Sequence, residues 1–129
     1  MGDLTDFAAQ ICDSIGKNTG HIAIVCDRDG VIAAFGAPKR ELLEKRCSPA
    51  LEQLMESRKS YRWNTDEQML RVSDGVERYH LGVSAPILAE GDLMGCVARL
   101  LEASDQPHTE SELKLVQTVA GFLGRQMEN

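Results

Sequence analysis

Several features that would assign this chain to a familiar class of protein are missing from its sequence. No apolar run approaches the roughly 20 residues that a membrane-spanning helix needs, so we expect no membrane partner. The first 15 residues lack the basic segment and the small-residue cleavage site of a secretion signal. Basic residues are outnumbered, with 14 Lys and Arg against 20 Asp and Glu, which gives a net charge of −6. We therefore expect no specific DNA binding by this chain alone, because DNA is bound through basic surfaces.

Motifs that hold metals or perform catalysis are also missing. No C-x-x-C spacing relates the four cysteines, which argues against a zinc site; these are Cys12, Cys26, Cys47 and Cys96. Without a secretion signal, we expect reduced thiols and a cytoplasmic location. The three histidines are far apart in the chain and suggest no metal site; they are His21, His80 and His108. The glycine-rich segments are turns rather than phosphate loops, so we expect no cofactor.

Two long strands joined by a tight turn dominate what is present, between Arg78 and Glu102. Apolar and polar or small residues alternate from residue 79 to residue 85, which is the period of a strand with two different faces. The turn is at residues 90–92, where Gly91 can adopt a positive φ, and Pro86 is expected at a bend or an edge. The return strand, 94–101, is apolar almost throughout, so it must be covered on both faces.

The remaining segments predict those covers. Apolar residues at helical spacing predict helices from Asp3 to Ile15, ended by Gly16, and from Thr109 to about Met127. Short helices are expected within 38–58, and strands at 21–26, 31–35, 60–64 and 69–72. We predict a single α+β domain over residues 1–129. Its central sheet is mostly antiparallel, with the terminal helices on one face and the short helices over the other.

Two local motifs make more specific predictions. An Asp-x-Asp-Gly run, Asp27 to Gly30, favours a hairpin turn in which the glycine has a strained φ. A calcium loop would need oxygen ligands where Val31 and Pro38 stand, so we set it aside. Thr109 and Glu112 form a capping box, in which the hydroxyl bonds the Glu112 amide and the carboxylate reaches back.

The long hairpin resembles that of GAF domains. In that family a Pro-Ile pair precedes a glycine turn, and a small residue begins the following strand; here these are Pro86, Ile87, Gly91 and Gly95. The stretches HIAIVCDRDGVIAAFG, SAPILAEGDLMGCV and VQTVAGFLGRQMEN further resemble the C-terminal GAF domains of the stage V sporulation protein T family of transcription regulators. This resemblance extends over nearly the whole chain, from about residue 4 to residue 128.

The resemblance implies a non-catalytic regulatory domain that senses a small molecule and passes its state on through the terminal helices. It also implies that DNA is contacted through a separate domain preceding the GAF domain, which these residues do not include. The Asn-Lys-Phe-Asp-Glu pattern of cyclic-nucleotide-binding GAF domains is not found here, so cyclic nucleotides are not the expected ligand.

A pocket for an unidentified small molecule is expected between the sheet and the 38–63 segment, because that segment is rich in aromatic residues and methionine. The residues expected to bind the ligand are Phe35, Leu43, Leu51, Met55, Trp63, Arg71, Tyr79 and His80. An equally open interpretation is that these apolar side chains form a second core.

The two terminal helices have wider apolar stripes than one sheet can cover, which predicts a homodimer or a higher homo-oligomer. The interface residues that we expect are Leu4, Phe7, Ile11, Val116, Val119, Ala120, Phe122, Leu123 and Met127. Gly121 and Gly124 would permit close approach of another helix. A purely structural dimerisation module, without a ligand, is the alternative.

Cys47 supports a different alternative, an enzyme. It follows Lys45 and Arg46 and precedes a helix start, and both features favour a thiolate. Some GAF domains reduce free methionine sulfoxide with such cysteines, which requires an attacking and a resolving thiol. Cys26 and Cys96 lie within predicted strands and are expected to be small core residues. We therefore expect structural thiols and no catalytic residue.

Overall fold

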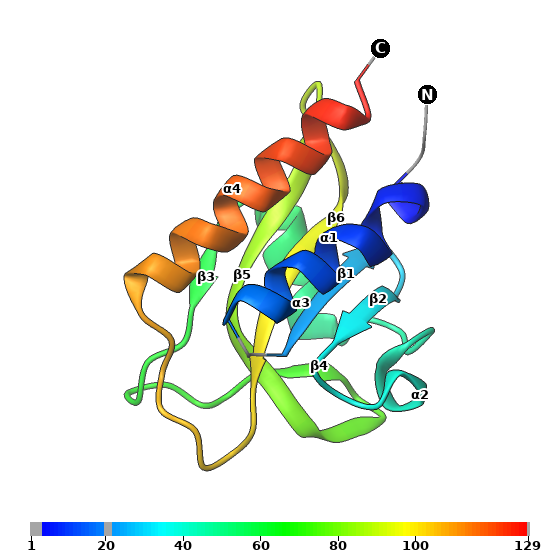
Figure 1. Ribbon diagram of the computed structural model, residues 1–129. Coiled ribbons are helices and arrows are strands. Elements are labelled where there is room, and N and C mark those ends of the chain that lie inside the picture. Colours follow the sequence, from blue (N-terminus) through cyan, green and yellow to red (C-terminus); the bar gives the residue numbers. More distant parts are fainter. Residues whose placement is uncertain (1–3, 20–21, 129) are drawn as a thin grey trace.

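The computed structural model describes residues 4–19 and 22–128, apart from the side chains of residues 18 and 19. Within these ranges, six strands form one antiparallel sheet between two layers of helices (Figure 1). The elements are α1 (Leu4–Thr19), β1 (Ala23–Asp27), β2 (Val31–Phe35), α2 (Lys39–Leu42), α3 (Pro49–Ser57), β3 (Tyr61–Arg62), β4 (Arg71–Ser73), β5 (Val76–Ala89), β6 (Asp92–Leu101) and α4 (Glu110–Gln126). The strand order is β2-β1-β6-β5-β3, with β4 also paired to β5. The predicted α+β class is confirmed.

The β5–β6 hairpin is the predicted one and forms the centre of the sheet. Glu90 and Gly91 make the turn with φ of 54° and 87°, the pair of positive angles that suits a two-residue hairpin. Pro86 lies opposite Cys96, beyond the short stretch of β5 that pairs with β3, so its missing amide removes no bond to that strand. The edge position expected for a strand proline is confirmed.

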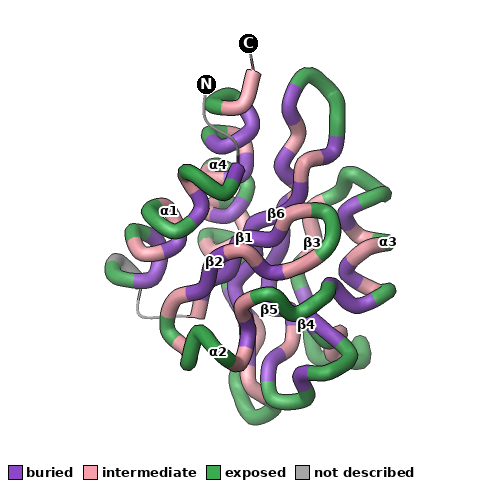
Figure 2. The backbone as a smooth tube through the Cα atoms, turned by 90° about the vertical axis from the view of Figure 1, so that its right-hand side faces the viewer, coloured by how far each residue is buried: buried purple, intermediate pink, exposed green. Residues whose placement is uncertain are grey.

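Each face of the sheet has its own core, which Figure 2 displays with α1 and α4 on one side and α3 on the other. We call the first the helix-pair face and the second the α3 face. On the helix-pair face the buried side chains from the helices are Leu4, Ala8, Cys12, Ile15, Val116, Ala120 and Leu123. On the α3 face they are Leu42, Leu51 and Met55, together with Cys47 from the segment between α2 and α3. The predicted division of the helices between the two faces is confirmed.

Two glycines serve purposes other than those predicted. Gly16 does not end the first helix, which continues to Thr19; the Phe35 ring packs against this glycine and leaves no room for a Cβ. Gly30 does not have a positive φ. Its backbone passes so close to the Lys45 carbonyl that a Cβ would lie 2.6 Å from that oxygen. The sequence indicated special positions in both cases, but close packing, not chain conformation, selects glycine there.

The segment between β2 and β4 is less helical than predicted. α2 has only four residues, and Leu42 is fully buried while Leu43 is half-buried. α3 begins as predicted, with Ser48 as N-cap: its Oγ accepts from the Leu51 amide at 3.1 Å and donates to the Arg71 carbonyl at 2.7 Å. The predicted strand at 60–64 is reduced to two residues, and that at 69–72 lies at 71–73. The predicted strand start at His21 lies outside the described residues.

Candidate functional site

The expected pocket on the α3 face is occupied by protein. Leu51 and Tyr79 are 0% and 1% exposed, and Met55 is buried in the same core, against which Leu43 packs. Near-zero exposure means that almost no water-sized space touches the first two side chains, whether outside or enclosed. Met55 also lines a cavity of about 240 Å³ together with Glu52, Glu56 and Leu93. The packing of Leu51 and Tyr79 favours the alternative of a second core, and ligand binding by the predicted residues stays a prediction.

Phe35 and Trp63 do not join that set. Phe35 lies on the opposite side of the sheet, because alternation along β2 directs it to the helix-pair face beside α1. Trp63 is buried beyond the end of β3, where its Nε1 donates to the Glu67 carbonyl at 2.8 Å and its amide to the Gly82 carbonyl at 2.9 Å. Both aromatics thus have structural contacts of their own.

Arg71 and His80 are brought together, as neighbours across β4 and β5. Burial, and secondarily the positive charge of Arg71, lowers the pKa of the half-buried His80. Arg71 also pairs with Glu77 at 3.5 Å on the surface, where such a pair contributes little to stability. The two predicted polar anchors therefore meet, but at a strand pair rather than over an open pocket.

A cavity of about 570 Å³ lies instead where β6 leaves the sheet and α4 begins. Its wall consists of Ile22, Gly36 and residues of the 100–112 segment, namely Leu100, Leu101, Glu102, Asp105, Gln106, Pro107, His108, Thr109 and Glu112. None of these residues belongs to the sites expected from the sequence. His108 packs over Gly82, where a Cβ would collide with its ring.

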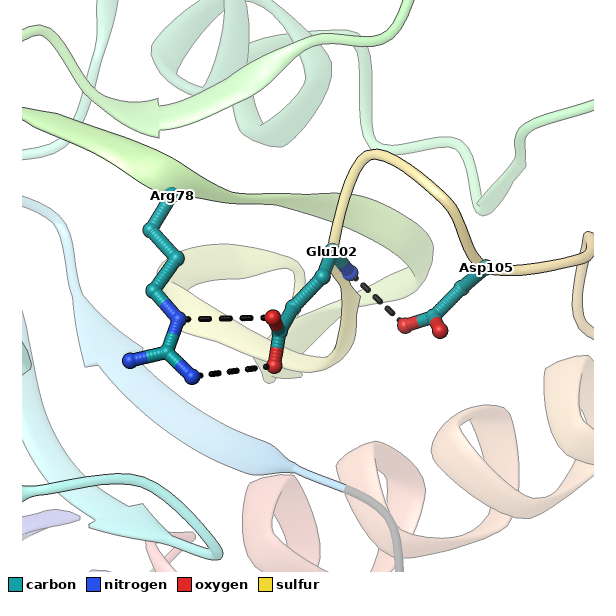
Figure 3. A network of polar contacts seen from close by, with 3 residues as sticks. All are labelled: Arg78, Glu102 and Asp105. Carbon is teal, nitrogen blue, oxygen red and sulfur yellow. Dashed lines mark hydrogen bonds and ion pairs between the residues drawn. The ribbon is translucent and has the colours of Figure 1, made fainter.

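A network of polar contacts joins Arg78, Glu102 and Asp105 (Figure 3). The Arg78 guanidinium on β5 donates to both carboxylate oxygens of Glu102, at 3.3 and 3.4 Å. The Glu102 amide donates to Asp105 Oδ2 at 2.8 Å, and the Asp105 amide donates back to the Glu102 carbonyl at 3.0 Å. The loop after β6 is thereby fixed to the neighbouring strand. Glu102 and Asp105 both line the cavity, so this network forms part of its wall.

Arg99 lies on β6 behind this cavity and is completely buried. Its Nη1 is 2.5 Å from Oε2 of Glu112, which belongs to the first turn of α4 and to the cavity wall. The Nε and Nη2 atoms of Arg99 make no hydrogen bond with any described group. Burial lowers the pKa of Arg99, and the Glu112 carboxylate opposes that effect. A buried guanidinium with unused donors is suited to an additional anionic or carbonyl oxygen.

Sequence reasoning missed this pair although a signal existed. Arg99 interrupts a strand that is otherwise apolar on both faces, and a buried arginine requires a partner. Glu112 was interpreted only as half of a capping box. Thr109 Oγ1 does accept from the Glu112 amide, at 3.3 Å, but the carboxylate pairs with Arg99.

The helix-pair face divides the expected interface residues into two groups. Leu4, Val116, Ala120 and Leu123 are buried against the chain's own sheet, so they are not available to a partner and the prediction for them is wrong. The others keep part of their surface; these are Phe7, Ile11, Val119, Phe122 and Met127. Within the described chain, Phe122 is the exposed large hydrophobic residue, at 42%. The apolar stripes of α1 and α4 are wide, as predicted, but most of their buried residues pack into the chain's own core.

The two α4 glycines also behave differently from the prediction. Gly124 packs against the Leu88 backbone of β5, so the close approach that it permits is to a strand rather than to another helix. Gly121 has open space where a Cβ would be, apart from Arg125 Nη1 at 3.5 Å. Neither glycine supplies evidence for a helix–helix contact.

The thiols are all free and buried, as expected for Cys26 and Cys96. Cys47 is also buried, although it lines a second cavity near α3. Within residues 4–19 and 22–128, no group of three acidic, histidine or cysteine side chains is arranged to hold a metal ion. In the same part of the chain, no helix has the length and apolar character needed to cross a bilayer.

Comparison with solved structures defines the class of this fold. The GAF domain of an Acinetobacter phosphoenolpyruvate-protein phosphotransferase aligns with a TM-score of 0.74 at 12% identity, covering 96% of this chain and 81% of that one. The cofactor-binding GAF domain of the nutrient sensor CodY from Clostridium difficile gives 0.67 at 14%, covering 92% and 82%. A type II free methionine-R-sulfoxide reductase from Thermoplasma acidophilum gives 0.66 at 9%, covering 95% and 93%. At these identities the likeness establishes the GAF fold and nothing about ligands.

Sequence comparison then identifies the family. Residues 3–128 match the family described as stage V sporulation protein T C-terminal, transcription factor. Stage V sporulation protein T of Bacillus subtilis (strain 168) is 37% identical over 132 aligned positions, which cover 99% of this chain and 71% of that protein. The chain belongs to the family of C-terminal domains of stage V sporulation protein T.

Proposed function

We propose that this chain is the regulatory domain of a bacterial transcription regulator, that it self-associates through its terminal helices, and that it has no catalytic role. The family supports the regulatory part, because its members are C-terminal domains of a transcription factor. The observation that carries the association is the flank of α4 formed by Leu115, Val119 and Phe122. These residues, spaced by four and three, keep part of their surface open to solvent.

The direction in which this flank faces can be inferred from a contact on the opposite side of α4. There, Gln117 Nε2 donates to Ser60 Oγ at 3.1 Å, next to β3. Val119 and Phe122 therefore face the other way, toward α1, on which Phe7 and Ile11 are also half-buried. Figure 1 shows α1 and α4 side by side on the same face of the sheet, with their outer surfaces uncovered. A second copy of the chain is an occupant that would cover both helices at once.

Sensing would act on the same helix. The cavity at the start of α4 includes Glu112, whose carboxylate is in contact with the buried Arg99. A small molecule in this cavity would touch the first turn of α4 directly. A ligand that binds one packing of α4 more tightly than another shifts the population of the two, which is how a sensory domain transmits its state. This position replaces the pocket expected on the α3 face.

DNA would be contacted by another domain of the regulator, in the cytoplasm. The basic side chains around α2 are interleaved with acidic ones, as in Lys39-Arg40-Glu41 and Glu44-Lys45-Arg46, and the chain carries a net charge of −6. Such a surface repels phosphate at long range.

Native mass spectrometry on three forms of the chain tests the proposal: the unmodified protein, Phe122→Asp and Thr118→Asp. Both variants add one negative charge to an exposed position of α4, but only the first disrupts the apolar flank. We expect the unmodified protein and Thr118→Asp to be dimers or larger. Phe122→Asp is expected to be a folded monomer, since burying an unpaired carboxylate in an interface is unfavourable.

The same spectra report a bound small molecule as excess mass. Excess mass on the unmodified protein, retained by the Phe122→Asp monomer, would support a ligand site within one chain. A monomeric unmodified protein at high micromolar concentration would refute the association, and equal assemblies for both variants would place the interface elsewhere.

A further inference from the structure

Three of the four cysteines meet on the α3 face, although they are far apart in the sequence. Cys26 of β1 is directly opposite Cys96 of β6 in the strand register. Cys47 comes from the segment between α2 and α3 and packs into the same core. All three side chains belong to one core, and the contacts with Cys47 and Cys96 raise the pKa of the Cys26 thiol. Each thiol taken alone is an ordinary small core residue, but together they place an attacking group next to a resolving group.

Cys47 is the member of this cluster that solvent can approach. It is 7% exposed and lines a cavity of about 570 Å³ together with residues of the α2–α3 segment and of the turn after β4. Its Sγ is 4.0 Å from the Asp27 carbonyl oxygen. Cys26 and Cys96 are 0% and 1% exposed and lie behind it. A small neutral molecule that enters this cavity reaches Cys47 first.

The electrostatics separate the roles further. The hydrogen bond from Cys26 lowers the pKa of the Cys47 thiol, against burial and the negative charges of Asp27, Glu52 and Asp29. The same contacts raise the pKa of Cys26, because its proton is shared with the other sulfurs and because it is buried. The thiolate is the nucleophilic form of cysteine, so Cys47 is the better attacking group.

Cys12 provides an internal contrast. It lies on α1, on the opposite side of the sheet, and donates its thiol hydrogen to the Ala23 carbonyl at 3.1 Å. Burial raises its pKa to about 12. It has no contact with the other three thiols, so it should behave as an inert core residue under the same conditions.

We propose that Cys47 and Cys26 are a site of reversible oxidation, at which a hydroperoxide converts the two thiols to an intramolecular disulfide. This inference goes beyond the proposed regulatory function and does not depend on it. The cluster of three sulfurs, one of them at a cavity wall, carries it.

The chemistry balances with a hydroperoxide as the oxidant. The Cys47 thiolate attacks one peroxide oxygen, the O–O bond breaks, and the other oxygen leaves as alkoxide or hydroxide and takes up the proton lost by Cys47. Cys47 is then a sulfenic acid. The Cys26 sulfur attacks the Cys47 sulfur, the S–O bond breaks, and the departing hydroxide leaves as water with the Cys26 proton. Two thiols lose two electrons in total, and one peroxide bond is reduced.

The resulting disulfide would join two parts of the fold that now touch only through non-covalent contacts. Residues 43–48 are held to the 27–31 turn by backbone bonds such as Val31 N to Lys45 O and Cys47 N to Asp29 O. A covalent bond from Cys47 to β1 would fix this segment to the sheet. Cys96 would remain as a second resolving thiol, able to exchange with the disulfide through Cys26.

The experiment treats the full chain with hydrogen peroxide, blocks remaining thiols under denaturing conditions with N-ethylmaleimide, and measures intact mass. In the unmodified protein we expect the four alkylated thiols to fall to two. The Cys12→Ser control should fall from three to one. Cys47→Ser should keep all three of its thiols, or lose them at least tenfold more slowly. Peptide mapping of the oxidised unmodified protein should show the Cys26–Cys47 linkage, which requires no variant to fold.

Several results would overturn the proposal. These are a mapped Cys26–Cys96 linkage formed equally fast in Cys47→Ser, loss of Cys12 alongside the others, or addition of oxygen mass to Cys47 without loss of a second thiol. Recovery of four thiols after treatment with dithiothreitol would confirm that the change is reversible. A change that persists after this treatment would contradict the disulfide.

Discussion

The two faces of the sheet bury different kinds of polar chemistry. The helix-pair face encloses a charge, because Arg99 is completely buried and relies on Glu112 of α4. The α3 face encloses thiols, with Cys26, Cys47 and Cys96 in one core. The first face is covered by two long helices, and the second by one nine-residue helix, a four-residue helix and irregular chain.

The comparison suggests that the elements packed over each face determine how far a chemical change in its core can spread. On the helix-pair face the Arg99–Glu112 ion pair connects the sheet to the first turn of α4, so a change in charge there acts on a whole helix. On the α3 face many short backbone bonds hold an irregular segment, so a chemical change acts locally. The first arrangement suits binding that moves a helix, and the second suits modification that fixes a loop.

Removing the Glu112 carboxylate should have the largest effect on stability. Glu112→Ala leaves a buried guanidinium without its carboxylate, so we expect a loss of about 3–5 kcal/mol in the free energy of unfolding. Urea denaturation followed by circular dichroism measures this. Glu110→Ala removes a carboxylate from the same helical turn at an exposed position, and it should lose well under 1 kcal/mol.

The double variant Arg99→Met/Glu112→Ala distinguishes charge from packing. If the loss comes from the unpaired charge, replacing Arg99 by an apolar side chain should restore most of the stability. A double variant as unstable as Glu112→Ala alone would mean that the carboxylate acts mainly through other contacts, and the contrast between the faces would weaken.

Leu51→Ala tests whether the α3 face is a packed core. Leu51 is fully buried under α3, so truncation should leave a cavity and lower the free energy of unfolding by about 2–4 kcal/mol. Leu54→Ala, at a half-buried position of the same helix, should lose about half as much or less. Chemical denaturation compares the two. A loss under 1 kcal/mol for Leu51→Ala would indicate that this space tolerates vacancy, as a ligand pocket does.

The helix caps offer the smallest and most closely matched comparison, with one cap on each face. Ser48→Ala should lose about 1–2 kcal/mol, because the buried hydroxyl caps α3 and also donates to the Arg71 carbonyl. Thr109→Ala should lose about 0.5–1 kcal/mol, since its hydroxyl accepts one bond at the exposed start of α4. The midpoint of thermal unfolding measures both changes. Equal shifts would contradict the view that Ser48 joins α3 to β4.

Local sequence patterns predicted the turns and helix caps well, because interactions between residues close in sequence determine these features. The Glu90–Gly91 turn and the Ser48 cap are each determined by a few neighbouring residues. The alternation predicted for residues 79–85 is wrong, because a register shift between Leu81 and Val83 places Tyr79 and Leu81 on the α3 face but Val83 and Ala85 on the helix-pair face. The two faces followed from the apolar stripes of the terminal helices. Gly16 and Gly124 were misinterpreted because their partners, Phe35 and Leu88, are distant in the sequence.

The candidate site was far less predictable for the same reason. The Arg99–Glu112 pair and the thiol cluster depend on which strands become neighbours, and hairpin patterns do not specify that β1 pairs with β6. The expected interface was wrong for those residues of α1 and α4 that face the sheet. Helical spacing shows which residues form an apolar stripe, but it does not show which of them the chain's own sheet already buries. An arginine within an apolar strand was the one visible signal.

The β1–β6 pairing also has a consequence for the order in which the chain folds. Two hairpins, β1–β2 and β5–β6, form from neighbouring sequence, whereas Cys26 and Cys96, opposite each other, are 70 positions apart. Closing so long a loop is entropically unfavourable until both hairpins exist, so we expect the docking of one hairpin onto the other to limit the folding rate. Newly made chains would then complete the central sheet only after β6 has been synthesised.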